Sequence, residues 1–264
     1  MQRVSVDPRA LEIARDLHRA ADAEQTILFG SRARGDYRTD SDLDILIVKD
    51  EIPPEHWLEK LRDQARELQK SRLPEASGID VICMTGAQFR SQRNLKNNLA
   101  NSIAKQAANV VPDENLEYGL QDEEENIDWE DVETKLHDAM GAARWLEAIA
   151  AAGILAAGDD KQIGRMAQNA LENAYKAALG AHGLEYPASG RDGHNLRILT
   201  GLLREGLQMP AEQEVPGEQH RYLSEFGGAA IYAHEHQPLD RDSLAREVTE
   251  AVAMLKGMVE AVKP

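Results

Sequence analysis

LFGSRARGDYRTDSDLDILIV, residues 28–48, contains the pattern from which the fold of the first part of the chain can be predicted. Its last seven residues are rich in Leu, Ile and Val and predict a buried strand over 42–48. TILF, residues 26–29, predicts a shorter buried strand that ends at Gly30. The loop between the two strands carries glycine, serine and several basic residues. This arrangement predicts two neighbouring strands joined by a loop whose polar and basic residues are candidates for a functional site.

Two carboxylates share one face of the second strand. Successive strand side chains alternate between faces, so Asp42 and Asp44 project on the same side, about 7 Å apart. Placing two acids on one face of an apolar strand is costly unless a cation compensates them. Asp80 begins another apolar strand, IDVICM at 79–84, and on a neighbouring strand it would point the same way. Three carboxylates predict a two-metal site of the kind that serves in-line displacement at phosphorus.

Gly30 and Ser31 lie between the first strand and a short predicted helix. A glycine there lets the backbone approach a phosphate, and Ser31 with nearby N–H groups can bind phosphate oxygens. Arg32 and Arg34 add positive charge, as does Arg38. A Gly-Ser pair alone indicates only a turn. Followed eleven residues later by Asp-x-Asp on a strand, it indicates a nucleotide site formed by Gly30, Ser31, Arg32 and Arg34.

The predicted elements change in kind along the chain. A helix near 8–22, the strands at 26–29 and 42–48, a helix opened by Pro53-Pro54 and the strand at 79–84 indicate a small mixed sheet within residues 1–111. Residues 112–130 are predicted to be an acidic linker. From 131 to 264 the expected segments are helical, at about 131–151, 159–182, 192–205, 217–233 and from 240 onward. The expected fold class is therefore α+β, with an all-α bundle following the sheet domain.

Charge and composition exclude several classes of protein. The 264 residues carry a net charge of −16. Residues 1–111 balance 17 basic against 17 acidic residues, whereas 112–131 hold ten acidic residues and no basic one. No strong nucleic-acid surface is expected from that distribution. Cys83 is the single cysteine, which excludes an internal disulfide, and no apolar run is long enough for a membrane span. A cytoplasmic protein is expected.

The motifs GSRARG, SDLDILIV and IDVI resemble those of the minimal nucleotidyltransferases of the DNA polymerase β superfamily, over roughly residues 7–111. Gly30, Ser31, Asp42, Asp44 and Asp80 match the family pattern. The resemblance implies that Asp42, Asp44 and Asp80 are both the catalytic and the metal-binding residues. It implies transfer of a nucleotidyl group, with AMP from ATP favoured, to a hydroxyl of a protein or small-molecule acceptor. Two Mg²⁺ ions are the expected cofactors, and Mn²⁺ is the alternative.

The helical half resembles a HEPN domain. The resemblance rests on Trp145 and on the segments GRMAQNALENAYKAAL (164–179), HGLEYP (182–187) and GHNLRIL (193–199). Ribonucleases of that family carry an arginine followed four to six residues later by histidine. Arg191 and His194 are too close together for this, so the resemblance does not imply ribonuclease activity. It does suggest a homodimer formed through the helical bundle.

The sequence is also compatible with two other functions. An aminoglycoside-type adenylyltransferase would also join such a domain to helices, and Glu172 or Glu225 would be its candidate general base. A non-catalytic protein of the toxin–antitoxin kind would use the bundle only for binding. His194 is expected to cap or pack its helix rather than catalyse. The YAHEH segment at 232–236 is not expected to bind metal, because histidines two apart do not share a helix face.

Overall fold

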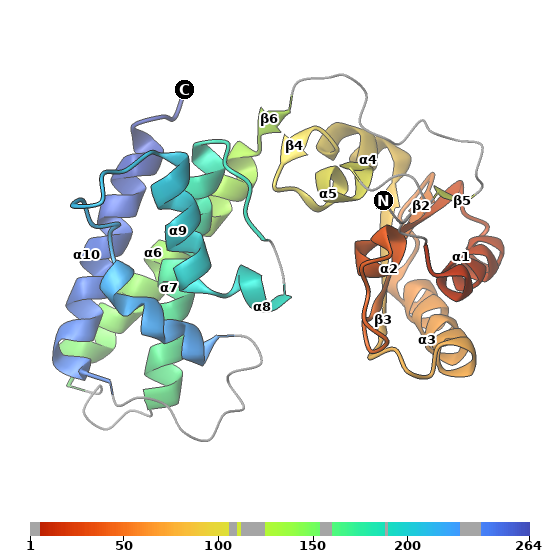
Figure 1. Cartoon of the computed structure of the whole chain (residues 1–264), viewed down its shortest axis with the longest axis horizontal. Coiled ribbons are helices and arrows are strands. Elements are labelled where there is room, and N and C mark those ends of the chain that lie inside the picture. Colours follow the sequence, from red (N-terminus) through yellow and green to blue (C-terminus); the bar gives the residue numbers. More distant parts are fainter. Residues whose placement is uncertain (1–5, 106–109, 112–124, 154–159, 188–189, 228–238) are drawn as a thin grey trace. The chain divides into compact units, whose positions relative to one another are not determined.

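The computed structural model describes residues 6–105, 110–111, 125–153, 160–187, 190–227 and 239–264. The chain divides into two compact units, Met1–Glu125 and Asn126–Pro264 (Figure 1). The first contains a mixed sheet with helices and the second is built of helices, which confirms the predicted α+β class. Most of the predicted acidic linker, residues 112–124, lies outside the described residues.

A four-stranded sheet organises the first unit. Its strands are β1 (Gln25–Phe29), β2 (Leu43–Lys49), β3 (Ile79–Thr85) and β5 (Val110–Val111), in the order β3-β2-β1-β5. β1 is antiparallel to both of its neighbours, whereas β2 and β3 are parallel. A parallel pair needs a crossover connection, which here contains α3 (Glu55–Arg72). The crossover brings the start of β3 next to the start of β2.

One face of the sheet is covered by α1 (Pro8–Ala21) and α3, which lie side by side in Figure 1. Asp7 caps α1 by accepting from the backbone N–H of Arg9, and Pro8 occupies the first turn. The apolar stripe of α1 packs on the sheet residues Leu43, Ile45 and Ile47. These are the strand residues predicted to face away from Asp42 and Asp44, so the predicted alternation is confirmed.

The opposite face is covered by two short helices that the sequence pattern did not indicate, α4 (Gly86–Gln92) and α5 (Leu99–Lys105). Phe89 of α4 and Ile103 of α5 pack with Phe29, Leu46 and Val48 in a second core. A capping box of Thr85 and Gln88 begins α4. Between the two helices lies the two-residue strand β4 (Leu95–Lys96). The sheet is therefore buried on both faces within this unit.

The second unit begins with β6 (Asn126–Ile127) and then contains α6 (Trp129–Ala151), α7 (Asp160–Ala181), α8 (Gly190–Gly193), α9 (Leu196–Gly206), the 3₁₀ helix η3 (Glu218–Phe226) and α10 (Arg241–Glu260). The bounds of α6, α7, α9 and α10 follow the predicted helices closely. α7 is buried on nearly all sides from Leu171 to Ala181, as expected of the central helix of a bundle. Among the described residues, no helix combines the length and the apolar character that crossing a membrane requires.

The helix predicted at 217–233 takes a different form. Gly217 has a φ of 78°, and His220 has non-helical backbone angles, so residues 218–226 form a kinked 3₁₀ helix rather than a regular α-helix. The buried side chains of η3 still face the core at helix-like spacing, which explains why the sequence pattern indicated an α-helix. Residues 228–233 of the predicted helix lie outside the described part of the chain.

Candidate active site

Three aspartates meet at one edge of the sheet. Asp44, near the start of β2, is paired in register with Asp80 on β3 and lies opposite Phe29 on β1. Asp42 is in the loop immediately before β2. Each aspartate offers an oxygen, and the three oxygens lie within 4.8 Å of one another. We call Asp42, Asp44 and Asp80 the carboxylate triad. The crossover through α3 thus brings together residues that are 38 positions apart in sequence.

The triad concentrates negative charge. Asp44 is partly buried, whereas Asp42 and Asp80 are exposed. Burial, followed by the charges of Asp42 and Asp80, raises the pKa of Asp44 to about 6, and the nearby Arg34 partly opposes the rise. An arrangement of this kind is unfavourable in the free protein, because three carboxylates repel one another and one of them is partly desolvated. A bound cation would relieve both penalties.

Gly30 lies directly against the triad. It has a φ of 73°, a conformation that residues with a Cβ rarely adopt. A Cβ added at this position would be 2.1 Å from the Oδ2 of Asp44. The backbone of the turn therefore comes close to the carboxylate only because no side chain intervenes. Ser31 follows at the start of the short helix α2 (Gly30–Arg34), where it is partly buried.

The two predicted nucleotide-binding arginines differ in placement. The exposed Arg34 contributes positive charge near Asp44, and its Nε lies 3.3 Å from a carboxylate oxygen of Asp36. Arg32, in contrast, has a fully buried side chain whose guanidinium contacts Asp7 and backbone carbonyls. The buried guanidinium faces the interior of the unit, whereas Arg34 is exposed. The nucleotide-binding role of Arg32 stays a prediction.

The donor set of the triad fits a divalent metal. All three ligands are hard carboxylate oxygens, which suit Mg²⁺ or Mn²⁺ rather than a softer metal. The close backbone approach at Gly30 and the charge of Arg34 lie beside it. Together these features are chemically suited to a divalent cation and a polyphosphate.

Comparison with known proteins finds one family that is similar to the first part of the chain. Residues 8–130 match the family model described as "Nucleotidyltransferase domain". This region is therefore similar to the nucleotidyltransferase domains of the DNA polymerase β superfamily, and a helical region follows it. No curated protein and no solved structure is significantly similar to the chain.

Because the pKa of Asp44 is raised, the stability of the metal-free protein should depend on pH. Below pH 4 the carboxyl is protonated in both the folded and the unfolded protein. Between pH 4 and pH 6 the unfolded chain loses a proton that the folded chain retains, so the Asp44 contribution lowers stability as pH rises through this window. At pH 7.5, metal-free Asp44→Asn should be more stable than the unmutated protein by up to about 2 kcal/mol, a value reduced for the partial exposure of Asp44.

Urea unfolding in EDTA at pH 4 and at pH 7.5 measures this difference. The gap between the two proteins should shrink at the lower pH, because protonated Asp44 carries no charge. An equal gap at both pH values would contradict the assigned pKa. Added Mg²⁺ should stabilise the unmutated protein more than Asp44→Asn.

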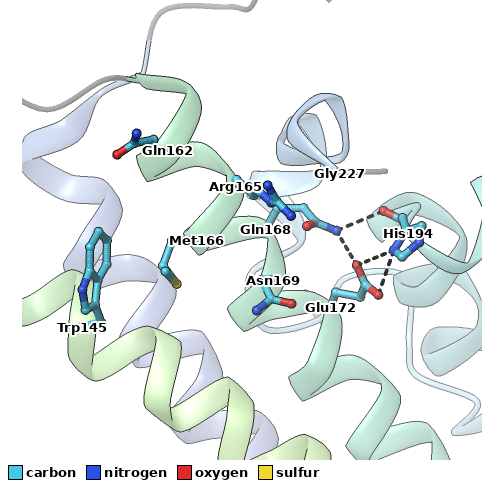
Figure 2. A pocket seen from close by; sticks show the side chains of 9 residues that line it. All are labelled: Trp145, Gln162, Arg165, Met166, Gln168, Asn169, Glu172, His194 and Gly227. Atoms are coloured by element: carbon cyan, nitrogen blue, oxygen red, sulfur yellow. Dashed lines mark hydrogen bonds and ion pairs between the residues drawn. The ribbon is translucent and has the colours of Figure 1, made fainter. Parts of the chain in front are cut away.

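The helical unit has a cavity of its own, of about 700 Å³. Figure 2 shows Trp145, Met166 and Arg165 around it, with Glu172 and His194 at one end. Glu172 accepts from the amide of Gln168 at 2.5 Å and from Lys176 at 2.7 Å, and the Nδ1 of His194 lies 3.1 Å from its carboxylate. Burial raises the pKa of Glu172, but the hydrogen bond and charge of Lys176 outweigh it and hold this pKa below its usual range. Glu172 is thus a charged member of a buried network.

Neutralising Glu172 should destabilise the bundle. In Glu172→Gln the ammonium of Lys176, which is 5% exposed, loses its buried partner. Breaking one side of a buried ion pair costs about 3–5 kcal/mol. We expect a loss near that size in chemical unfolding, against about 0.5 kcal/mol or less for the exposed control Glu147→Gln. Equal stabilities of the two variants would show that the network contributes nothing.

The structure assigns no catalytic feature to the other candidates from the sequence. Glu225 is exposed on η3, and Cys83 is partly buried on β3, where burial raises the pKa of its thiol. Tyr232, His234 and His236 lie outside the described residues. Sequence reasoning missed the contact between Asp7 and Arg32 that supports the site. No local pattern distinguishes a buried arginine from an exposed one.

Proposed function

We propose that the protein transfers a nucleotidyl group, AMP from ATP, to a hydroxyl of an acceptor. The acceptor oxygen forms a bond to the α-phosphorus of the nucleotide, the bond from that phosphorus to the bridging oxygen breaks, and pyrophosphate leaves. The hydroxyl proton passes to solvent. The observation that carries the proposal is the carboxylate triad, with its oxygens within 4.8 Å of one another, inside a nucleotidyltransferase domain.

Each feature of the site has a part in this reaction. Asp42, Asp44 and Asp80 would hold two Mg²⁺ ions, or Mn²⁺ in their place. When bound, these ions supply positive charge that activates the attacking oxygen and neutralises the reacting phosphate. The backbone at Gly30 and Ser31 leaves room for phosphate oxygens, since no Cβ fills the space beside Asp44. Arg34 adds charge that attracts the triphosphate to this edge.

The electrostatics of the triad favour this enzyme over a non-catalytic binding protein. A partly buried Asp44 with two acidic neighbours destabilises the fold unless a cation is bound. A protein that binds no metal would gain nothing in return for this loss of stability. The aminoglycoside-type alternative would use a general base from the helices. Glu172 is poorly suited to that role, because its carboxylate already accepts from Gln168 and Lys176 and its lowered pKa makes it a weak base.

The burial of Tyr175 and Tyr186 argues against these two tyrosines as sites of self-modification. The hydroxyl of Tyr175 donates to the carbonyl of Pro216, and that of Tyr186 donates to Asp131. Both side chains are buried, and burial raises the pKa of each hydroxyl. Neither is free to attack a nucleotide. We therefore propose that the acceptor is a separate protein or small molecule.

Labelled ATP tests the proposed function. The protein is incubated with Mg²⁺, a cell extract, and ATP labelled either at the α-phosphate or at the γ-phosphate. We expect the α label to enter an acceptor and the γ label to appear in pyrophosphate, both dependent on Mg²⁺. Transfer of the γ label to the acceptor would mean phosphoryl transfer instead, and no Mg²⁺-dependent transfer of either label would refute the proposal.

A further inference from the structure

A buried ion pair, Asp7 with Arg32, lies in the same unit as the carboxylate triad. Nη1 of Arg32 is 2.6 Å from Oδ2 of Asp7, and the two side chains are 0% and 1% exposed. Asp7 is also joined to Arg32 through the backbone, where its N–H donates to the Arg32 carbonyl at 3.2 Å. The ring of Tyr37 covers the guanidinium, with its centroid 5.0 Å from Cζ. The pair thus connects the start of α1 with α2.

The same guanidinium binds the loop that carries Asp42. Its Nη2 donates to the carbonyls of Thr39 at 2.9 Å and Ser41 at 2.7 Å, and its Nε lies 3.0 Å from the Ser41 carbonyl and 3.2 Å from the Asp42 carbonyl. The loop, residues 35–42, contains no helix or strand. One arginine therefore holds three carbonyls at the end of an otherwise irregular segment.

Asp42 depends on this anchor more than its partners do. Asp44 and Asp80 lie within paired strands, whose backbone hydrogen bonds fix their separation. Asp42 lies outside the strand and has an exposed side chain. The contacts of its loop include those of Arg32 and two backbone bonds, in which the N–H of Ser77 donates to the Asp40 carbonyl and the N–H of Leu43 donates to the Gly78 carbonyl. A shift of this loop would move Asp42 relative to the other two carboxylates.

Stability alone does not explain a buried arginine at this position. Two apolar side chains of similar size commonly stabilise a fold as well as a buried ion pair does. A planar guanidinium with five donors, in contrast, can hold several carbonyls at once in a fixed geometry, which an apolar side chain or a lysine cannot do. The contacts made by Arg32 use that property.

From these contacts we propose that Arg32, held by Asp7, is a positioning residue that sets Asp42 in place for metal binding. It touches neither metal nor nucleotide, and acts through the backbone of Thr39, Ser41 and Asp42. The inference rests on the proposed function, because it assumes that the triad binds divalent metal.

Manganese binding to the full chain, followed by electron paramagnetic resonance, tests the inference. The main variant is Asp7→Ser/Arg32→Met, which removes both charges together and keeps a capping oxygen at the start of α1. We expect it to melt within a few degrees of the unmutated protein and to bind Mn²⁺ at least about tenfold more weakly. Arg32→Lys, which keeps the charge but loses the fork of donors, should also bind Mn²⁺ more weakly.

Leu17→Ala is the matched control. Leu17 is fully buried in the core of the same unit, so this variant loses stability without touching the loop. Its Mn²⁺ affinity should be unchanged. Nucleotidyl transfer by Asp7→Ser/Arg32→Met should recover at high Mn²⁺ concentration, since all three carboxylates of the triad remain in this variant. A defect of folding alone would appear as a lower melting temperature measured without metal, and Leu17→Ala shows how far such a defect by itself affects Mn²⁺ binding.

The outcomes separate the two proposals. If the unmutated protein binds Mn²⁺ and either the double variant or Arg32→Lys binds it equally well, the positioning role is wrong while the proposed function stands. If the double variant unfolds, the Mn²⁺ affinity of Arg32→Lys alone tests the positioning role. Failure of the unmutated protein to bind Mn²⁺ would overturn the proposed function, together with the role of Arg32 that rests on it.

Discussion

The Asp42→Ala/Asp44→Ala variant should lose metal-dependent nucleotidyl transfer by roughly a thousandfold or more, because one carboxylate cannot hold the metal charge that the reacting phosphate requires. Its fold should persist, since Asp44 makes the free protein less stable rather than more. Transfer of the α-phosphate label and thermal melting in EDTA measure the two effects. Asp80 remains in this variant, so residual weak metal binding is compatible with the loss of activity.

Asp36→Ala/Asp40→Ala is the control for charge. Both side chains are exposed acids of the same loop, 59% and 69% exposed, and neither belongs to the triad. Removing them changes the local charge by the same amount and should leave transfer within a few-fold of normal. Full activity in Asp42→Ala/Asp44→Ala, or an equal loss in the control, would mean that the triad has no specific part in the reaction.

Gly30→Ala should also abolish transfer, by at least about a hundredfold. The added Cβ would be 2.1 Å from the Oδ2 of Asp44, so the carboxylate or the turn has to move. The positive φ of 73° adds backbone strain of about 1–2 kcal/mol, which should appear as a lower melting temperature. Activity should fall much further than that loss of stability explains, because the folded fraction of the protein remains high.

Gly153→Ala separates strain from the clash at the triad. Gly153 has a similar φ of 69°, and the described residues leave space for a Cβ there. This variant should show a comparable loss of stability and normal transfer. If Gly153→Ala were as inactive as Gly30→Ala, backbone strain rather than the contact with Asp44 would account for the effect.

The strands and the carboxylate triad could be predicted from sequence because the side chains of a strand alternate between its two faces with a period of two residues. Alternation along residues 42–48 placed Asp42 and Asp44 on one face, and the apolar run after Asp80 indicated a neighbouring strand. α4 and α5 were missed because each has only seven residues, too few to show a helical period. The dimer and the HEPN-like character of the helical unit stay predictions.

The burial of Arg32 could not be predicted from the local sequence. In GSRARG, Arg32 and Arg34 are equivalent by composition, yet one is buried and the other exposed. The difference arises from Asp7, which is 25 residues away and supplies the counter-charge that permits burial. A contact of that sequence separation leaves no local signal, so only the structure reveals which arginine supports the loop.

The most direct measurement of the central claim is a crystal structure of the full chain with Mn²⁺ and a non-hydrolysable ATP analogue, with anomalous diffraction used to locate the metal. Manganese peaks are expected between Asp42, Asp44 and Asp80, with the triphosphate of the analogue beside Gly30 and Ser31. The peaks should disappear in Asp42→Ala/Asp44→Ala. A bound analogue with manganese at other residues, and none at the triad, would contradict the account.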